Sequence, residues 1–291
     1  MKLVNPKFEE IDISNPLLHG EMCTRVCYKS ENLVKEGSAK KLLTGIAEAG
    51  HTAMLEHIPV YLFVTFTGFA GVTSPIRKIW ESPYTKYEID SDPDDNLYMY
   101  ISTNLRVVYE NYRALYDAFM DNEGEPFDFN DDSSKVKSIR NCKFEDCPEM
   151  FHRRITIKFT MDRIGSQSFC RHRVFSFAQE STRWCNYLKD KFGSEISIST
   201  PCWLKEEDKE EFEKDMKEIE QYYFKWINKG YKAEEARYFL PFGLKTEIIM
   251  TGFVDAWEHF FALRVDGHAH SQARELAIPL YEYFKEKKYI I

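Results

Sequence analysis

The stretch SQSFCRHRVFSFAQESTRWCNY, from Ser166 to Tyr187, holds the densest chemical pattern of this sequence. It places Arg171, His172 and Arg173 among aromatic residues, in a chain whose formal net charge is −8. Guanidinium groups donate paired hydrogen bonds to phosphate or carboxylate, and they also stack on aromatic planes. These residue types therefore indicate a pocket for a phosphorylated, aromatic small molecule.

A short basic run has a simpler interpretation as well. Such runs commonly form a solvated face or pair with acidic residues elsewhere, and three residues alone are a weak signal. Against this stands the apolar interleaving by Phe169, Phe175 and Trp184, which suits a surface tail poorly. On chemistry alone, both interpretations stay open.

The same stretch matches a known signature. Arg171-His172-Arg173, followed after seven residues by Ser181, is the RHR-x7-S pattern of the flavin-dependent thymidylate synthases. Further similar blocks follow the family's order at Gly50-His51, Glu56-His57, Gln179–Arg183, Cys185–Tyr187, Arg237–Pro241 and Leu263-Arg264. The sequence therefore resembles this family as one domain over 1–291, apart from about 69–150, which we interpret as an insertion on the family core.

The resemblance implies a fold, a reaction and an assembly. The fold would be α/β (α+β), a single thymidylate synthase-complementing-type domain with a central sheet and long helices. The assembly would be a homotetramer in which each active site is shared between subunits. The reaction would be the reductive methylation of dUMP to dTMP in de novo dTMP biosynthesis. Methylenetetrahydrofolate would be the carbon donor, FAD the hydride carrier and NADPH the reductant.

The resemblance also assigns roles residue by residue. The residues expected to bind FAD are His51, Arg171, His172, Arg173, Gln179 and His268. Those expected to bind dUMP are Gln179, Glu180, Ser181, Arg183, Arg237 and Arg264, with Gln179 and Glu180 lining the same pocket partly through backbone groups. Arg264 is the expected catalytic residue, because a guanidinium at the uracil edge would stabilise negative charge developing on the pyrimidine.

Some positions depart from the family pattern. Ser168 stands where the family usually has Gln or Glu facing the nucleotide, and Phe253 and Asp255 stand where some members have Asn and Arg. These departures leave the contacts to the FAD adenine and ribose open. Two rival functions follow: a flavoprotein acting on another uridine nucleotide, and an inactive structural homologue.

Composition limits the class of protein. With 43% hydrophobic residues, the 291-residue chain can bury a sizeable core, and it lacks an apolar run long enough to span a bilayer. We expect a cytoplasmic protein without membrane association. The excess of acidic over basic residues argues against a nucleic-acid-binding module, which is the main alternative to an enzyme. The seven cysteines are expected to be free thiols, and we expect no metal site.

Hydrophobic periodicity predicts the main elements. Helices are expected over 39–49, 104–120, 205–229, 233–239, 251–263 and 269–287, the last interrupted near Pro279. Strands are expected over 60–67, 154–162 and 196–200, with a strand and a turn within 1–20. The segment 69–150 is expected to pack through one helix and otherwise to line the surface.

Overall fold

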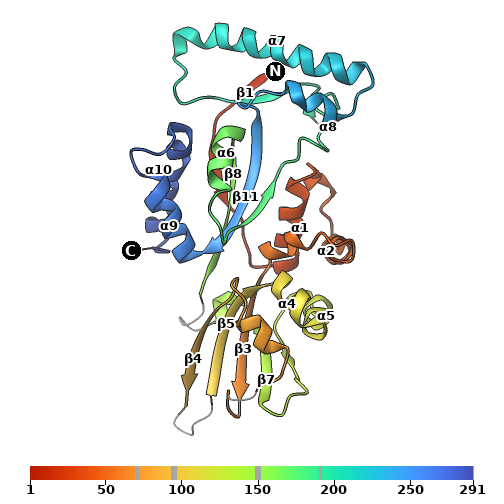
Figure 1. Cartoon of the computed structure of the whole chain (residues 1–291), viewed down its shortest axis with the longest axis vertical. Helices are drawn as coiled ribbons and strands as arrows, with labels where there is room; N and C mark the ends of the chain where they lie inside the picture. Colours follow the sequence, from red (N-terminus) through yellow and green to blue (C-terminus); the bar gives the residue numbers. More distant parts are fainter. Residues whose placement is uncertain (70–71, 93–96, 148–151, 190–191, 291) are drawn as a thin grey trace.

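The computed structural model describes residues 1–69, 72–92, 97–147, 152–189 and 192–290. A four-stranded antiparallel sheet lies in the middle of the molecule, and a five-stranded antiparallel sheet lies below it (Figure 1). The middle sheet has the order β2 (Lys7–Glu10), β8 (Arg154–Asp162), β11 (Lys245–Phe253) and β9 (Ser176–Gln179). The lower sheet has the order β4 (Lys86–Ser91), β5 (Leu97–Asn104), β3 (Pro59–Phe66), β7 (Val136–Cys142) and β6 (Phe127–Phe129).

The centre of the middle sheet is the pairing of β8 with β11. The two strands are in register over nine residues, from Arg154 opposite Phe253 to Asp162 opposite Lys245. One face is covered by α9 (Val254–Arg264) and α10 (Ser271–Glu286), which lie beside these strands in Figure 1. Trp257 of α9 is fully buried there, and its indole nitrogen donates to the Ile155 carbonyl at 3.2 Å. This packing fixes α9 relative to the ladder.

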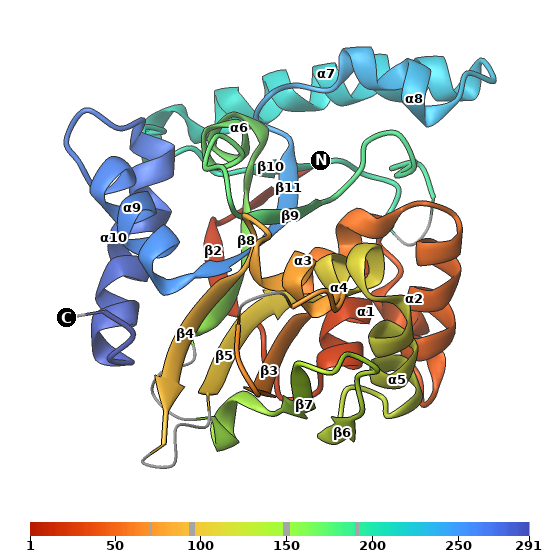
Figure 2. The same cartoon turned by 60° about the horizontal axis from the view of Figure 1, so that its bottom comes forward.

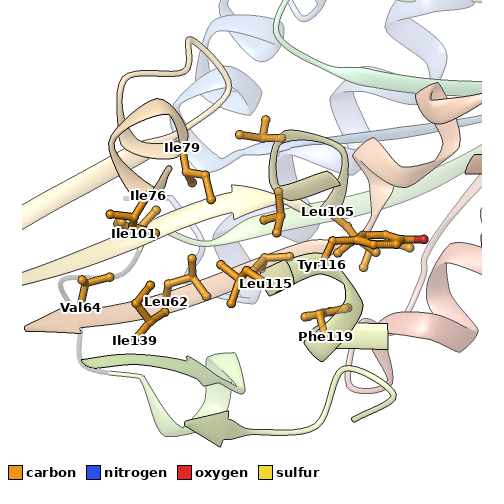
Figure 3. Close-up of a cluster of buried hydrophobic side chains, with 14 of the residues drawn as sticks. Leu62, Val64, Ile76, Ile79, Ile101, Leu105, Leu115, Tyr116, Phe119 and Ile139 are labelled. Atoms are coloured by element: carbon orange, nitrogen blue, oxygen red, sulfur yellow. The ribbon is translucent and has the colours of Figure 1, made fainter. Parts of the chain in front are cut away.

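The lower sheet has a core of its own. Side chains from β3, β5 and β7, such as Leu62, Ile101 and Ile139, pack against Ile76 and Leu105 (Figure 3). The helices on this core include α3 (Ile76–Trp80), α4 (Leu105–Asn111) and α5 (Arg113–Asp121). Four of the five strands of this sheet lie within 69–150. The expectation that this segment packs through one helix and otherwise lines the surface is therefore wrong, although its status as an insertion stays a prediction.

The N-terminal part adds α1 (Pro16–Val26), η1 (Glu31–Leu33), α2 (Ser38–Glu48) and η2 (Thr52–His57). The predicted helix over 39–49 is confirmed as α2, followed by Gly50 with a φ of 79°. Helix α1 was not predicted, because PLLHGEMCTRV shows little helical segregation of apolar residues. Its N-cap is nevertheless regular, since the Asn15 side chain accepts a hydrogen bond from the Leu18 amide at 2.9 Å.

A third layer crosses the top of the molecule. It contains the long helix α7 (Lys209–Asn228), with η5 (Glu206–Asp208), α8 (Ala233–Ala236) and η6 (Arg237–Phe239) next to it (Figures 1 and 2). The predicted amphipathic helix is confirmed, because Tyr223 and Ile227 are buried on its inner face. Beneath it, β1 (Lys2–Val4) pairs in parallel with β10 (Ser197–Ser199). A further short element, η3 (Phe144–Asp146), follows β7.

Three predicted helices differ in the structure. The helix predicted over 104–120 breaks at Tyr112, whose φ of −145° is not helical and whose hydroxyl donates to Asp131 at 2.7 Å. The start of the helix predicted over 251–263 belongs to β11, so α9 begins at Val254. Helix α10 is continuous through Pro279 rather than interrupted. The other predicted strands and helices agree with the structure to within a few residues.

The overall class is confirmed as a mixed arrangement of helices and sheets. Among the described residues, none of the helices combines the length and the apolar character that crossing a bilayer would require.

Two buried histidines lie between the N-terminal helices and the middle sheet. His57 contacts the Thr251 hydroxyl at 2.8 Å, Thr251 contacts Thr156 at 2.8 Å, and Thr156 contacts His19 at 3.3 Å. Both histidine side chains are buried, with at most 1% of their surface exposed. Burial lowers the pKa of His19 to about 4 and that of His57 to about 3. Both imidazoles are therefore neutral in the folded protein near pH 7.

These lowered pKa values predict a loss of stability in acid. Between pH 6.5 and about 4 the unfolded chain binds protons at these histidines while the folded chain does not, so stability falls as pH falls. From pH 7 to pH 5 each histidine should contribute a loss of about 2 kcal/mol in the free energy of unfolding. Urea titrations at both pH values should therefore show a weaker pH dependence for His57→Gln. The exposed His270→Gln is the control, and identical pH dependence in His57→Gln and the unmodified chain would contradict the prediction.

Candidate functional site

The RHR turn, residues 170–174, connects a short helix to strand β9. Asp162 at the end of β8 caps α6 (Arg163–Phe169), accepting from the Gly165 amide at 2.6 Å and from the Gln272 side chain of α10 at 2.7 Å. Helix α6 buries Phe169, and the chain then turns through Arg171, His172 and Arg173 into β9. The RHR turn therefore directly follows α6, a short helix that is capped by Asp162 and linked to α10 through Gln272.

The end of the RHR turn is fixed by an aromatic ring. Val174 has a φ of 69°, a left-handed conformation that is costly for a β-branched residue. Directly after it, the ring of Phe175 packs on the backbone of β11 at Gly252, where an added Cβ would lie 2.5 Å from the ring. Because glycine leaves this space, Phe175 can be buried. The strained turn is thereby held in place.

His172 and Arg264 form the closest contact between predicted site residues. The Arg264 Nε donates to the His172 Nε2 at 2.8 Å, and its Nη2 donates to the Ser168 carbonyl at 2.9 Å. Arg264 is the last residue of α9, so residues 92 apart in sequence meet here. Burial, with the nearby Arg264 and His259, lowers the pKa of His172 to about 4. His172 is therefore a neutral acceptor near pH 7.

Three predicted arginines are available for an anionic ligand. Arg171, Arg173 and Arg237 are exposed, and within the described ranges their side chains have no hydrogen-bond or ion-pair partner. Burial lowers the pKa of Arg264, and the positive charge of Arg171 lowers it further. Such unpaired guanidinium groups suit phosphate or pyrophosphate binding.

Gln179 and Glu180 face opposite sides of the sheet. The Gln179 amide donates to Ser166 at 2.8 Å and to Thr246 at 3.3 Å, on the side of α6. The buried Glu180 instead accepts from Tyr187 at 3.1 Å and pairs with Lys245 at 2.9 Å. The two side chains do not meet within this subunit, because adjacent residues on an extended backbone point to opposite faces. That both residues line the nucleotide pocket, partly through backbone groups, stays a prediction.

The remaining predicted residues lie at the surface. Arg183 pairs with Glu234 of α8 at 2.9 Å, and its amide donates to the Ser181 hydroxyl at 3.3 Å. His51 is exposed at the junction of α2 and η2. His268 is fully exposed and contacts Asp266 at 2.9 Å. No contact within the described part of the chain joins either histidine to another predicted site residue.

Sequence reasoning missed a charged cavity on the face of the middle sheet to which the Glu180 side chain points. This cavity of about 590 Å³ is lined by Lys29, Tyr187, Lys245 and Glu180, among others. Glu247 lies beneath it and pairs with Lys29, Lys245 and Lys158. Burial alone would raise the pKa of Glu247, but these lysines outweigh burial and lower it to about 2. The alternation of Lys245 and Glu247 along β11 could have indicated this charged cavity. That inference would first have required β11 to be recognised as a strand.

The close approach at Gly252 gives a prediction. Gly252→Ala would force its methyl group into the Phe175 ring and should lower the free energy of unfolding by roughly 1–3 kcal/mol. Gly243→Ala is the matched control, because its Cβ would lie at an ordinary 3.6 Å from Ile198. Urea unfolding of both variants distinguishes them. Equal stability of the two variants would show that the burial of the Phe175 ring does not depend on the space left by Gly252.

Comparisons with known proteins identify the family. The sequence model described as "Thymidylate synthase complementing protein" matches residues 96–288, about two thirds of the chain. The flavin-dependent thymidylate synthase of Sulfurisphaera tokodaii is 34% identical over 126 residues, which are 43% of this chain and 48% of that protein. That of Pyrococcus furiosus is 33% identical over 122 residues, covering 41% and 49%. The chain thus spans about half the length of the curated relatives it matches.

Among solved structures, a UMP/dUMP methylase PolB from Streptomyces cacaoi, bound with 5-Br dUMP, is 14% identical and covers 98% of this chain and 93% of its own. Its TM-score is 0.42, too low to establish a common fold. The match of the family model, in contrast, includes the RHR turn, Ser181 and Arg264. The chain belongs to the thymidylate synthase complementing protein family.

Proposed function

We propose that this chain is a flavin-dependent thymidylate synthase acting in the cytoplasm. It converts dUMP to dTMP by reductive methylation, with methylenetetrahydrofolate as carbon donor and NADPH as reductant. The observation that carries the proposal is the contact of Arg264 with His172, which joins two separate family motifs in one place. The family membership and the curated relatives support the same reaction.

The residues at the RHR turn fit FAD. Arg171 and Arg173 offer unpaired guanidinium groups for its pyrophosphate, and the neutral His172 lies between them on the same turn. Bound FAD supplies the hydride-transfer chemistry, which no side chain of the protein can provide. In this proposal His51, Gln179 and His268 complete the cofactor site. The role of the protein is to bind the flavin, orient it and exclude water.

Arg264 is oriented for a pyrimidine substrate. A guanidinium has five N–H donors, and His172 and Ser168 engage one each, so three remain for the uracil edge. Two fixed donors also restrict the rotation of the side chain, which lowers the entropic cost of binding substrate. Charge stabilisation at the uracil ring by such a pre-oriented group is the catalytic role that we assign to Arg264.

The 5′-phosphate of dUMP requires other groups. We assign it to Ser181, Arg183 and Arg237, with Gln179 and Glu180 nearby in the assembled site. Arg183 pairs with Glu234, but both side chains are substantially exposed. Exposed ion pairs contribute little, so a phosphate dianion can replace the Glu234 carboxylate. Arg237 needs no such exchange, since it has no side-chain partner within the described residues.

We further propose a homotetramer with shared active sites. Large aromatic side chains lie exposed near the proposed phosphate residues, with Trp184 61%, Tyr238 88% and Phe242 65% accessible. Exposed aromatic clusters of this kind are typical of interaction surfaces. A second subunit covering Trp184 and Tyr238 would also place its own residues next to Arg183 and Arg237.

The proposed role of Arg264 is tested by substitution. Arg264→Ala should reduce dTMP formation by roughly 100- to 1000-fold while FAD stays bound, because charge stabilisation of the substrate is lost but the RHR turn remains. Arg140→Ala, which removes an exposed arginine of β7 that pairs with Asp128, and Cys202→Ala are the controls. Both should retain turnover, since no contact joins either residue to a predicted site residue and the proposed reaction needs no cysteine nucleophile. Unimpaired dTMP formation by Arg264→Ala would exclude its catalytic role. Parallel assays with dUMP and UMP distinguish the proposed reaction from action on another uridine nucleotide.

Shared active sites predict complementation between inactive variants. If Arg237 and Arg264 of one site come from different subunits, mixed tetramers of Arg237→Ala and Arg264→Ala should contain some intact sites. Refolding the two variants together should restore part of the dTMP formation that neither shows alone. Complete inactivity of the mixture, despite mixed tetramers seen by native mass spectrometry, would place both residues on one subunit.

A further inference from the structure

Strand β4 is the outermost strand of the lower sheet, and the exposed apolar side chains of this region gather on it (Figures 1 and 2). Among the described residues of 59–147, the large apolar side chains that are exposed are Tyr84 at 45%, Tyr87 at 44% and Ile89 at 48%. Tyr87 and Ile89 belong to β4, and Tyr84 directly precedes it. Apolar side chains concentrated along one sheet edge are typical of an interaction surface.

The backbone of β4 is regular and open on its outer side. It pairs with β5 in unbroken register, from Lys86 opposite Ser102 to Ser91 opposite Leu97. Its sequence KYEIDS contains no proline, the residue that most directly blocks strand pairing. Within the described residues, no backbone hydrogen bond joins β4 to a segment other than β5. Because alternate amides and carbonyls of an edge strand point away from its neighbour, β4 offers a template for another strand.

The side chains of β4 are complementary to those of a second β4. In an antiparallel pair centred on Glu88, Lys86 lies opposite Asp90 of the partner subunit, and Tyr87 lies opposite Ile89 of the partner subunit. Each contact occurs twice, because a two-fold axis relates the two copies. Opposite charges and aromatic–β-branched pairs are favourable cross-strand contacts. A pair centred on Ile89 would instead place Glu88 opposite a like charge at position 90.

The charged residues of β4 are able to make these contacts. Lys86 pairs with Asp255 of its own subunit, but both side chains are partly exposed, and such pairs contribute little. One Asp90 carboxylate oxygen accepts from the Ser91 amide at 2.8 Å, and no hydrogen bond or ion pair within the described residues engages the other. Glu88 opposes the pairing, because two copies of it meet at the axis. His152 lies 3.0 Å from Glu88 and offsets part of this repulsion when protonated.

We propose that β4 pairs with β4 of a second copy of this chain, so that two five-stranded sheets join into one continuous sheet. The complementary register identifies a second copy as the occupant, since an unrelated strand would have no reason to match it. The inference goes beyond the proposed reaction and does not rest on it. It gives the segment 69–150 a role in assembly, through an edge separate from the aromatic surface around Trp184 and Tyr238.

Two single charge reversals test this register. Lys86→Glu places like charges at both contacts between positions 86 and 90, and Asp90→Lys does the same with the opposite sign, so each variant should lose the pairing. A mixture of the two variants should regain it, because both contacts between unlike copies then join opposite charges. Lys78→Glu, which reverses an exposed lysine of α3, is the matched control and should behave as the unmodified chain.

The readout is hydrogen–deuterium exchange of the amides of β4 in the full chain. The amides that point away from β5 should exchange at least about tenfold more slowly in the unmodified chain than in either single variant. The mixture should restore this protection, and native mass spectrometry with one variant isotope-labelled should show pairs of unlike copies. Glu88→Gln removes the like charges at the axis, so protection should persist at a lower protein concentration than in the unmodified chain.

Fast exchange of the outward amides in the unmodified chain would overturn the inference, and it is the result expected if another protein were the natural partner. Protection that survives in both single variants, or that the mixture fails to restore, would overturn it as well. These measurements contain neither flavin nor nucleotide, so their outcome is independent of the tests of the proposed function.

Discussion

The antiparallel ladder between β8 and β11 determines where the candidate site can form. At one end of the ladder β8 leads through the Asp162 cap into α6 and the RHR turn. At the opposite end β11 leads into α9, which begins beside Arg154. Nine paired residues extend about 30 Å, and the eleven residues of α9 rise about 16 Å back along that length. The antiparallel register therefore returns Arg264 to the RHR turn.

The contact made there depends on a neutral imidazole. A protonated His172 would have donors on both ring nitrogens and could not accept from the Arg264 Nε. Burial and the adjacent arginine charge keep the His172 pKa near 4, so the acceptor is available at neutral pH. The Phe175 ring on Gly252 and the cap by Asp162 hold the turn from both ends. The orientation of Arg264 thus depends on the packing of the RHR turn as well as on the hydrogen bonds to His172 and Ser168.

The sequence was sufficient for elements with strong periodicity and for the motif residues. The stripe over 205–229 and the alternation over 154–162 predicted α7 and β8, and the family resemblance named both His172 and Arg264. Strand β11 was missed because its apolar run, buried on both faces, does not alternate. The opposite facing of Gln179 and Glu180 depended on β9, a four-residue strand too short to show a period. Predicting the ion pair between Lys86 and Asp255 required knowledge of which strand lies beside α9.

The central claim is that one site holds both a flavin and dUMP. The most direct test is the visible absorption spectrum of the purified protein saturated with FAD, recorded before and after dUMP is added. The proposed function predicts oxidised flavin bands that shift on addition of dUMP, with a smaller shift or none in Arg264→Ala. A protein that takes up no FAD, or flavin bands that stay unchanged at saturating dUMP, would contradict a shared flavin and nucleotide site.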